Sequence, residues 1–302
     1  MKKVWLGVLL VVAAAAGWYF YGQQTPPMDV VSAARLPLLE LQRAAERGEP
    51  AAQYMLGLRY ETGEGGIKEP VLAVSWYRKA AEQGLADAQQ ALGYDYYKGV
   101  GVTRDLASAL HWFQLAAEQG QAESQLLTGL FYLQGKAGKP DPVAAANWLR
   151  KAAEQGQKKA QYYLAGLYQA GIGVAKDDEK ALDWLRKAAE QGEAEAQLHL
   201  GAFYNEGAGV KPDATLSAYW WRKAAEQGMR DAQYLLGDLY ENGRGVSADL
   251  EQAYAWYALA AAGGQPAAKK AQEVLIAKMP PASLVQARTL AASYARQYVT
   301  AH

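Results

Sequence analysis

Cysteine is absent from this chain, and neither sign of charge dominates it. None of the 302 residues is cysteine, which excludes disulfides, thiolate metal ligands, a cysteine nucleophile and a lipidated cysteine anchor. The 31 basic and 31 acidic residues give a formal net charge of zero. Such a surface has no long-range field to steer a charged polymer, and no run of Lys or Arg stands out, so we expect no nucleic-acid partner.

Residues and motifs suited to catalysis are also scarce. The chain has three histidines, and neither His111 nor His199 has a second histidine at H-x-x-x-H spacing. The glycine-rich segments lack the Lys-Ser or Lys-Thr pair of a phosphate-binding loop, and no G-x-S-x-G nucleophile elbow occurs. Because an active site needs a converging set of distinct groups, the sequence predicts no enzyme, no cofactor and no metal site.

The dominant feature of the chain is a motif that recurs six times at a spacing of 36 residues. Its clearest columns are Trp76, Trp112, Trp148, Trp184, Trp220 and Trp256; Gln53, Gln89, Gln125, Gln161, Gln197 and Gln233; and Gly84, Gly120, Gly156, Gly192, Gly228 and Gly264. A period of this length indicates a stack of similar supersecondary units that bury their apolar faces against their neighbours. Residues present six times are expected to be structural, since a catalytic residue would be needed once.

One repeat, residues 85–120, predicts two helices. Tyr96 lies on the apolar stripe of the first helix, and Gly99 supplies the left-handed conformation that ends it. Asp105 stands where its side chain can cap the second helix, which carries Trp112. A short connection makes the two helices antiparallel, and we expect the rings of Tyr96 and Trp112 to fill the space between them.

The recurring runs AQYLLGDLY (232–240), GRGV (243–246) and AAEQG (188–192) carry a family resemblance. The pattern resembles the Sel-one-like repeat family, a branch of the tetratricopeptide-like helical arrays. The resemblance implies an all-α, right-handed α-solenoid of six 36-residue helix-turn-helix repeats with capping helices at both ends.

Three units depart from the common pattern. The fourth unit has Ala165 where the others have glycine, the third has KAGKP at 136–140 in place of the G-x-G-V loop, and the first has GGI at 65–67. We expect these departures to alter local loop geometry and to leave the fold unchanged.

The array divides the chain into four segments. We expect residues 1–27 to form a membrane anchor or signal peptide with a short spacer, and residues 28–48 to form an N-terminal capping helix. Residues 49–264 form the six repeats, and residues 265–302 form the C-terminal capping helices.

The amino terminus predicts export. Two lysines precede an uncharged apolar stretch, residues 4–21, which spans roughly 27 Å at about 1.5 Å per residue. The lysines should stay in the cytoplasm, and the aromatic residues 18–21 suit the far headgroup region, which favours an uncleaved inner-membrane anchor. Ala14 and Ala16 leave open a cleaved signal peptide. Both alternatives place the repeats in the periplasm.

One face of the first helices varies between units and is rich in Tyr and Leu, where a face without a role would be polar. Stacking should bring this face to the concave side, which repeat arrays use for binding. Tyrosine gives a large contact area with little entropy loss, so we expect a groove for a partner protein. The candidate binding residues are Tyr54, Tyr94, Tyr97, Leu130, Tyr162, Tyr163, Gln169, His199, Asn205, Tyr234 and Asp238.

The resemblance implies a scaffold for protein–protein contacts in envelope regulation or assembly. Some relatives sequester a toxic effector in the periplasm, so an immunity protein is a sharper version of this hypothesis. The alternative is a structural envelope component that contacts glycan or peptidoglycan by stacking tyrosines on sugar rings. Hydrolase activity, assigned to certain cysteine-rich relatives, is disfavoured because this chain has no cysteine.

Overall fold

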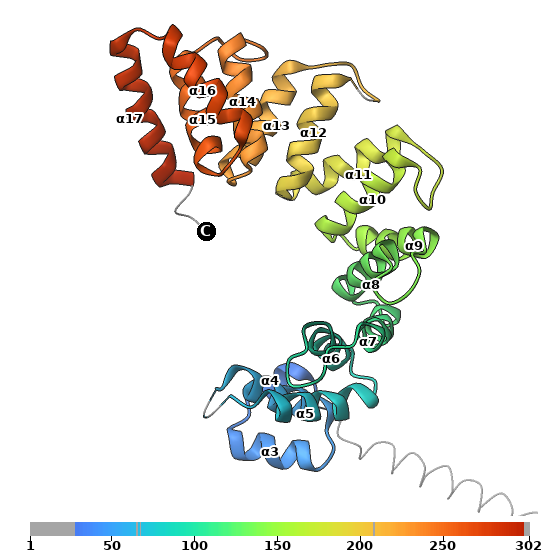
Figure 1. Ribbon diagram of the computed structural model, residues 1–302. Coiled ribbons are helices and arrows are strands. Elements are labelled where there is room, and N and C mark those ends of the chain that lie inside the picture. The colour runs from blue at the N-terminus through green and yellow to red at the C-terminus, as the bar shows by residue number, and fades with distance from the viewer. Residues whose placement is uncertain (1–27, 65, 67, 208, 299–302) are drawn as a thin grey trace, which may run out of the picture. The chain divides into compact units, whose positions relative to one another are not determined.

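The computed structural model describes residues 28–298 apart from positions 65, 67 and 208, and all secondary structure in these residues is α-helical. The helices form two compact units that divide after Gly120 (Figure 1). Unit 1 holds α2 to α7, and unit 2 holds α8 to α17. Each unit is described separately below.

Unit 1 consists of two short helices followed by two repeats. Its helices are α2 (Val30–Ala34), α3 (Leu38–Glu46), α4 (Pro50–Thr62), α5 (Pro70–Glu82), α6 (Ala86–Lys98) and α7 (Leu106–Glu118). The region expected to hold one capping helix therefore contains two, α2 and α3, and both contact α4.

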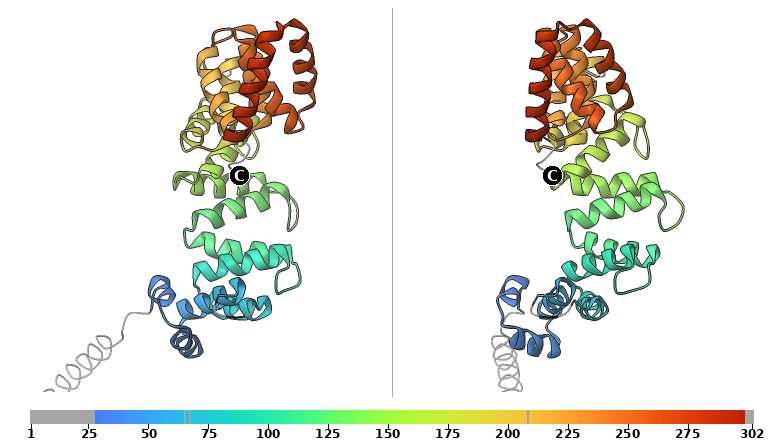
Figure 2. Two further views of the ribbon diagram at one scale, coloured as in Figure 1. Left: turned by 90° about the vertical axis from the view of Figure 1, so that its left-hand side faces the viewer. Right: turned by 60° about the vertical axis from the view of Figure 1, so that its left-hand side comes forward.

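Unit 2 consists of four repeats and two closing helices. Its helices are α8 (Ala122–Gln134), α9 (Pro142–Glu154), α10 (Lys158–Ala170), α11 (Asp178–Glu190), α12 (Ala194–Glu206), α13 (Ala214–Glu226), α14 (Arg230–Asn242), α15 (Leu250–Ala262), α16 (Pro266–Lys278) and α17 (Pro281–Tyr298). Both closing helices pack against α15. Within each unit, the two helices of each repeat lie antiparallel and side by side (Figure 2). The structure confirms the predicted helical array of six helix-turn-helix repeats.

The helix ends follow from local backbone chemistry. Every first helix ends at a glycine with φ between 61° and 80°, a conformation that a Cβ disfavours. Five of the six second helices begin at an aspartate whose carboxylate accepts a hydrogen bond from a first-turn N–H group. The predictions for Gly99 and Asp105 are both confirmed.

The two helices of a repeat approach closely because a glycine on the first helix faces a large side chain on the second. A Cβ built on Gly93 would lie 2.7 Å from the ring of Phe113, which is fully buried. The predicted residues Tyr96 and Trp112 are both half-buried and pack against the core that includes Leu92, but the side chain that faces Gly93 is that of Phe113. The other facing pairs of this kind are Gly57 with Tyr77, Gly129 with Leu149, Gly201 with Trp221 and Gly237 with Tyr257.

Buried glutamines join each repeat to the preceding one. Gln89 is 4% exposed, and its amide donates to the carbonyl oxygen of Ala81 on the preceding second helix at 3.1 Å. Its side-chain oxygen accepts from Gln119 at 2.8 Å. Gln53, Gln161 and Gln197 make the same two hydrogen bonds. The glutamines at this position are therefore structural, because the hydrogen bonds of each buried amide group are made across an otherwise apolar interface.

The predicted membrane segment, residues 4–21, and the spacer to residue 27 lie outside the described residues. Among the helices of residues 28–298, none is both long and apolar enough to cross a membrane.

We expect Gln89→Leu to lower the free energy of unfolding by about 2 kcal/mol, because two hydrogen bonds worth about 1 kcal/mol each are lost. The matched change Gln119→Ala, at the exposed end of the same bond, should cost less than about 1 kcal/mol. Urea denaturation followed by circular dichroism measures both values. Equal costs for the two variants would contradict a structural role for the buried amide.

Candidate functional site

The structure places all eleven predicted binding residues on first helices, and none of them is fully buried. Gln169, His199 and Asn205 are exposed, and the other eight are half-buried. Four of the eleven surround one pocket in unit 2, namely Tyr162, Tyr163, Gln169 and His199.

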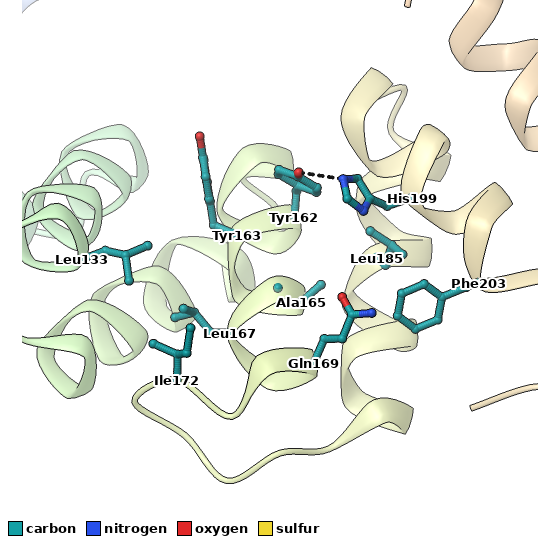
Figure 3. A pocket seen from close by; sticks show the side chains of 11 residues that line it. Leu133, Tyr162, Tyr163, Ala165, Leu167, Gln169, Ile172, Leu185, His199 and Phe203 are labelled. Atoms are coloured by element: carbon teal, nitrogen blue, oxygen red, sulfur yellow. Dashed lines mark hydrogen bonds between the residues drawn. The ribbon is translucent and has the colours of Figure 1, made fainter. Parts of the chain in front are cut away.

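This pocket is apolar and has a volume of about 400 Å³. It lies between α10 and α12, and α8 and α11 complete its walls (Figure 3). Its lining consists of Leu133, Tyr162, Tyr163, Ala165, Gly166, Leu167, Gln169, Ile172, Leu185, His199 and Phe203. Leu167, Leu185 and Phe203 are at most 4% exposed, which makes them part of the hydrophobic core as well.

The pocket lies beside a position where the fourth repeat has a smaller residue than the three repeats before it. Gly166 takes the position held by Tyr94 and Leu130 in the two preceding repeats, and a Cβ built on it meets no atom within 4 Å. Leu185 takes the position held by Phe113 and Trp221 in two other repeats and by the identical Leu149 in the preceding one. The side-chain volume that is missing at Gly166 leaves open space beside α10.

A tyrosine and a histidine form a polar edge on this apolar pocket. Tyr162 Oη and His199 Nε2 are 3.2 Å apart, and their rings lie 5.5 Å apart (Figure 3). Desolvation lowers the pKa of His199 although the charge of Glu195 opposes the shift, so the ring is neutral at pH 7. Desolvation, followed by the charge of Glu195, raises the pKa of Tyr162. The pocket therefore has no charged group in its lining at neutral pH and suits an apolar side chain.

Sequence reasoning missed the floor of the pocket. The replacement of glycine by Ala165 was expected to alter a loop, but Ala165 lies within α10 and lines the cavity. The usable signal was the pair Ala165-Gly166. The other repeats have glycine at the buried position of Ala165, whereas this repeat has its glycine one residue later, on the exposed face of the helix.

The other seven predicted residues do not line this pocket. Tyr54 and Tyr94 line a second pocket in unit 1. Leu130 packs against the core of unit 2, and Tyr234 lies 5.7 Å from the ring of Tyr257. Of the last three, Tyr97 accepts a hydrogen bond from Arg104 through its backbone carbonyl, Asp238 forms an ion pair with Arg244, and Asn205 is exposed to solvent.

The second pocket has a volume of about 360 Å³ and a mixed polar lining. It lies along α4 and α6 and is lined by Tyr54, Glu61, Lys68, Asp87, Gln90, Ala91, Tyr94, Asp95, Lys98 and Val100. Asp95 is 6% exposed, and its Oδ2 has no hydrogen-bond partner among the described residues. Burial, together with the charge of Glu61, raises the pKa of Asp95 to about 7, while Lys98 opposes the shift.

Neither pocket offers a metal site. Within the described part of the chain, no group of three or more His, Cys, Asp or Glu side chains is arranged to hold a metal ion.

The raised pKa of Asp95 predicts that this residue destabilises the protein at alkaline pH. The folded state holds the proton more tightly than the unfolded chain, whose aspartate has a pKa of 3.8, so stability falls as pH rises from about 4 to about 7. Asp95→Asn removes the ionisation. We expect it to raise the free energy of unfolding by up to about 4 kcal/mol at pH 8 and by less than half of that at pH 5. Urea denaturation at both pH values measures the difference.

The exposed acid Glu82, on α5 of the same unit, provides the control. Glu82→Gln makes the same change in net charge and should leave the pH dependence of stability unaltered. An Asp95→Asn variant whose gain in stability is the same at pH 5 and pH 8 would refute the burial of an ionisable carboxyl group.

Comparison with known proteins identifies the family to which the chain belongs. No curated protein matches this chain. Among solved structures, c5321, a protective antigen of uropathogenic Escherichia coli with an SLR fold, is 34% identical over 90% of this chain, with a TM-score of 0.60. This chain spans 65% of the length of that protein. A Sel1 repeat protein from Oxalobacter formigenes is 31% identical over 76% of this chain and 96% of its own, with a TM-score of 0.65. The Sel1 repeat matches residues 50–85, 86–121, 122–157, 158–193, 194–229 and 230–265, so the chain belongs to the Sel1 repeat family.

Proposed function

We propose that this protein is an exported, non-catalytic scaffold that binds a partner protein by taking an apolar side chain into the pocket of unit 2. The observation that carries the proposal is the 400 Å³ apolar cavity between α10 and α12, which the helical packing does not require. The three preceding repeats have Leu58, Tyr94 and Leu130 at the position that Gly166 takes here. A vacant apolar cavity forfeits packing energy in the free protein, so a bound side chain would restore it.

The edge of the pocket suits a protein ligand. Tyr162 and Tyr163 are half-buried with their rings 5.4 Å apart, so they offer flat apolar contact surfaces beside the cavity. Rigid aromatic residues around a desolvated pocket are typical of the energetic centre of protein interfaces. Glycan contact is favoured less, because the hydroxyl groups of a sugar would lose their hydrogen bonds against a floor of Leu167, Leu185 and Phe203.

The periplasm is the proposed location, and inner-membrane anchoring by residues 4–21 is the proposed attachment. Both proposals are supported by the two lysines that precede the apolar stretch and by the aromatic residues at its far end. In the periplasm, the scaffold would act in envelope regulation or assembly. Sequestering an effector as an immunity protein is one form that such binding would take.

Filling the pocket provides the test. Gly166→Leu introduces the side chain that Leu130 carries in the preceding repeat, and the space above Gly166 can accept it. We expect affinity capture from envelope extracts with the full chain to recover a stoichiometric partner, and Gly166→Leu to weaken its binding at least tenfold, or about 1.4 kcal/mol. The measurement is the dissociation constant of the recovered partner.

A matched control is available on the same helix. Ala170 is exposed near the end of α10 and does not line the pocket, so Ala170→Leu adds the same type of side chain outside it. The control should bind the partner like the unaltered chain. Retention of the partner by Gly166→Leu at full affinity would place the binding surface elsewhere.

Export is tested by fusing residues 1–27 to alkaline phosphatase, which becomes active outside the cytoplasm. We expect an active fusion whose full length is retained in the membrane fraction. An active but shortened, soluble fusion would instead indicate cleavage near Ala14 and Ala16, and an inactive fusion would contradict export.

A further inference from the structure

Asp95 occupies a position that the fold uses for an apolar side chain. The same position in four other repeats holds Phe131, Leu167, Phe203 and Leu239, all of which are buried. In the first repeat it holds Arg59, whose guanidinium reaches the carbonyl oxygen of Leu36. A carboxyl group in this place costs stability unless it is paired. The described residues supply Asp95 Oδ2 with no hydrogen bond, so the packing of the repeat does not account for the aspartate.

The pocket around Asp95 collects acidic and aromatic side chains. Glu61, on α4, contributes a second carboxylate, whose Oε2 accepts from Tyr77 Oη of α5 at 2.6 Å. Asp87 contributes a third from the start of α6. Lys98, at the end of α6, and Lys68, in the loop after α4, balance two of these charges. A cation is therefore favoured over an anion.

We propose that this pocket of unit 1 binds the side chain of an arginine of a partner protein, with its guanidinium donating to Asp95. A guanidinium has five N–H groups in a planar fork, so it can donate to the Asp95 carboxylate and to Glu61 together. Tyr54 and Tyr94 both line the pocket, and the ring of Tyr94 already attracts a cation, since Lys98 Nζ lies over it at 5.5 Å from the ring centroid. An ammonium group fits less well because it is a compact point charge that does not match two carboxylates held by different helices.

Binding of this kind is coupled to a proton. Only the ionised Asp95 attracts a cation, and its pKa is about 7 because of its burial and of Glu61. The other titratable or charged groups in and beside the pocket are Tyr54, Glu61, Lys68, Tyr77, Asp87, Tyr94 and Lys98. Tyr54 and Tyr77 stay protonated at neutral pH, because desolvation raises the pKa of both. Affinity for the arginine should therefore fall about tenfold from pH 8 to pH 6.

The experiment uses the full chain and a blocked Gly-Arg-Gly peptide, with blocked Gly-Lys-Gly and Gly-citrulline-Gly peptides as comparisons. Isothermal calorimetry and NMR titration measure each dissociation constant at pH 8 and pH 6. We expect the arginine peptide to bind more tightly than the lysine peptide, the citrulline peptide not to bind, and proton release to accompany binding near pH 7. Equal affinity for arginine and lysine or for arginine and citrulline would overturn the proposal.

Two variants separate this site from the pocket of unit 2. Asp95→Asn should abolish binding of the arginine peptide. This loss of binding cannot be attributed to unfolding, because the variant is expected to be more stable than the unaltered chain. Gly166→Leu lies in unit 2 and should bind the arginine peptide like the unaltered chain. Unchanged binding by Asp95→Asn would refute the inference and leave the function proposed for the apolar pocket untouched.

Discussion

The close approach of two helices in every repeat is the constraint on which the structure depends. In five of the six repeats, a glycine in the first helix removes the Cβ that would strike the second helix, and one large side chain then fills the remaining space. The fourth repeat has Ala165 at this position. Gly93 with Phe113 and Gly201 with Trp221 show this arrangement. Because the helix spacing repeats, the volume available at each position is nearly the same, and a smaller side chain leaves a cavity where the backbone cannot collapse. The apolar pocket beside Gly166 lies where such a side chain is missing.

The sequence predicted the features that depend on short stretches of chain. Gly99 and Asp105 end and begin helices through their own backbone chemistry, so their roles could be predicted from one repeat. The choice between Trp112 and Phe113 could not, because adjacent residues of a helix differ by about 100° and both are aromatic. Tyr162 and His199 were found as candidates because their face varies between repeats. Leu185 was not, because it lies on another helix and its contact with α10 depends on the packing register.

The repeat also makes exceptions informative. A residue that breaks a column has no counterpart in the neighbouring repeats, so the packing they share does not require it. Gly166 lacks the bulk found in the preceding repeats, and Asp95 introduces a carboxyl group into a column of Phe and Leu. These two exceptions lie in different units and have opposite chemistry, since one pocket is apolar and the other contains carboxylates. Positions at which one repeat differs from the others thus locate both sites. Positions that hold the same residue in all repeats locate the scaffold.

Both exceptions lower stability locally, and the architecture limits the consequences. In a stacked array, each repeat contacts only its neighbours, so the cost of a cavity or a buried acid is confined to one interface. The glutamine links continue through the repeats that hold the pockets: Gln89 lies on the helix that carries Asp95, and Gln161 lies on the helix that carries Gly166. These hydrogen bonds hold α6 and α10 on the preceding helix, and the two pockets lie beside the same two helices. A rigid backbone beside an unfilled pocket is the preorganised arrangement that favours binding, because little of the protein must be ordered when the ligand enters.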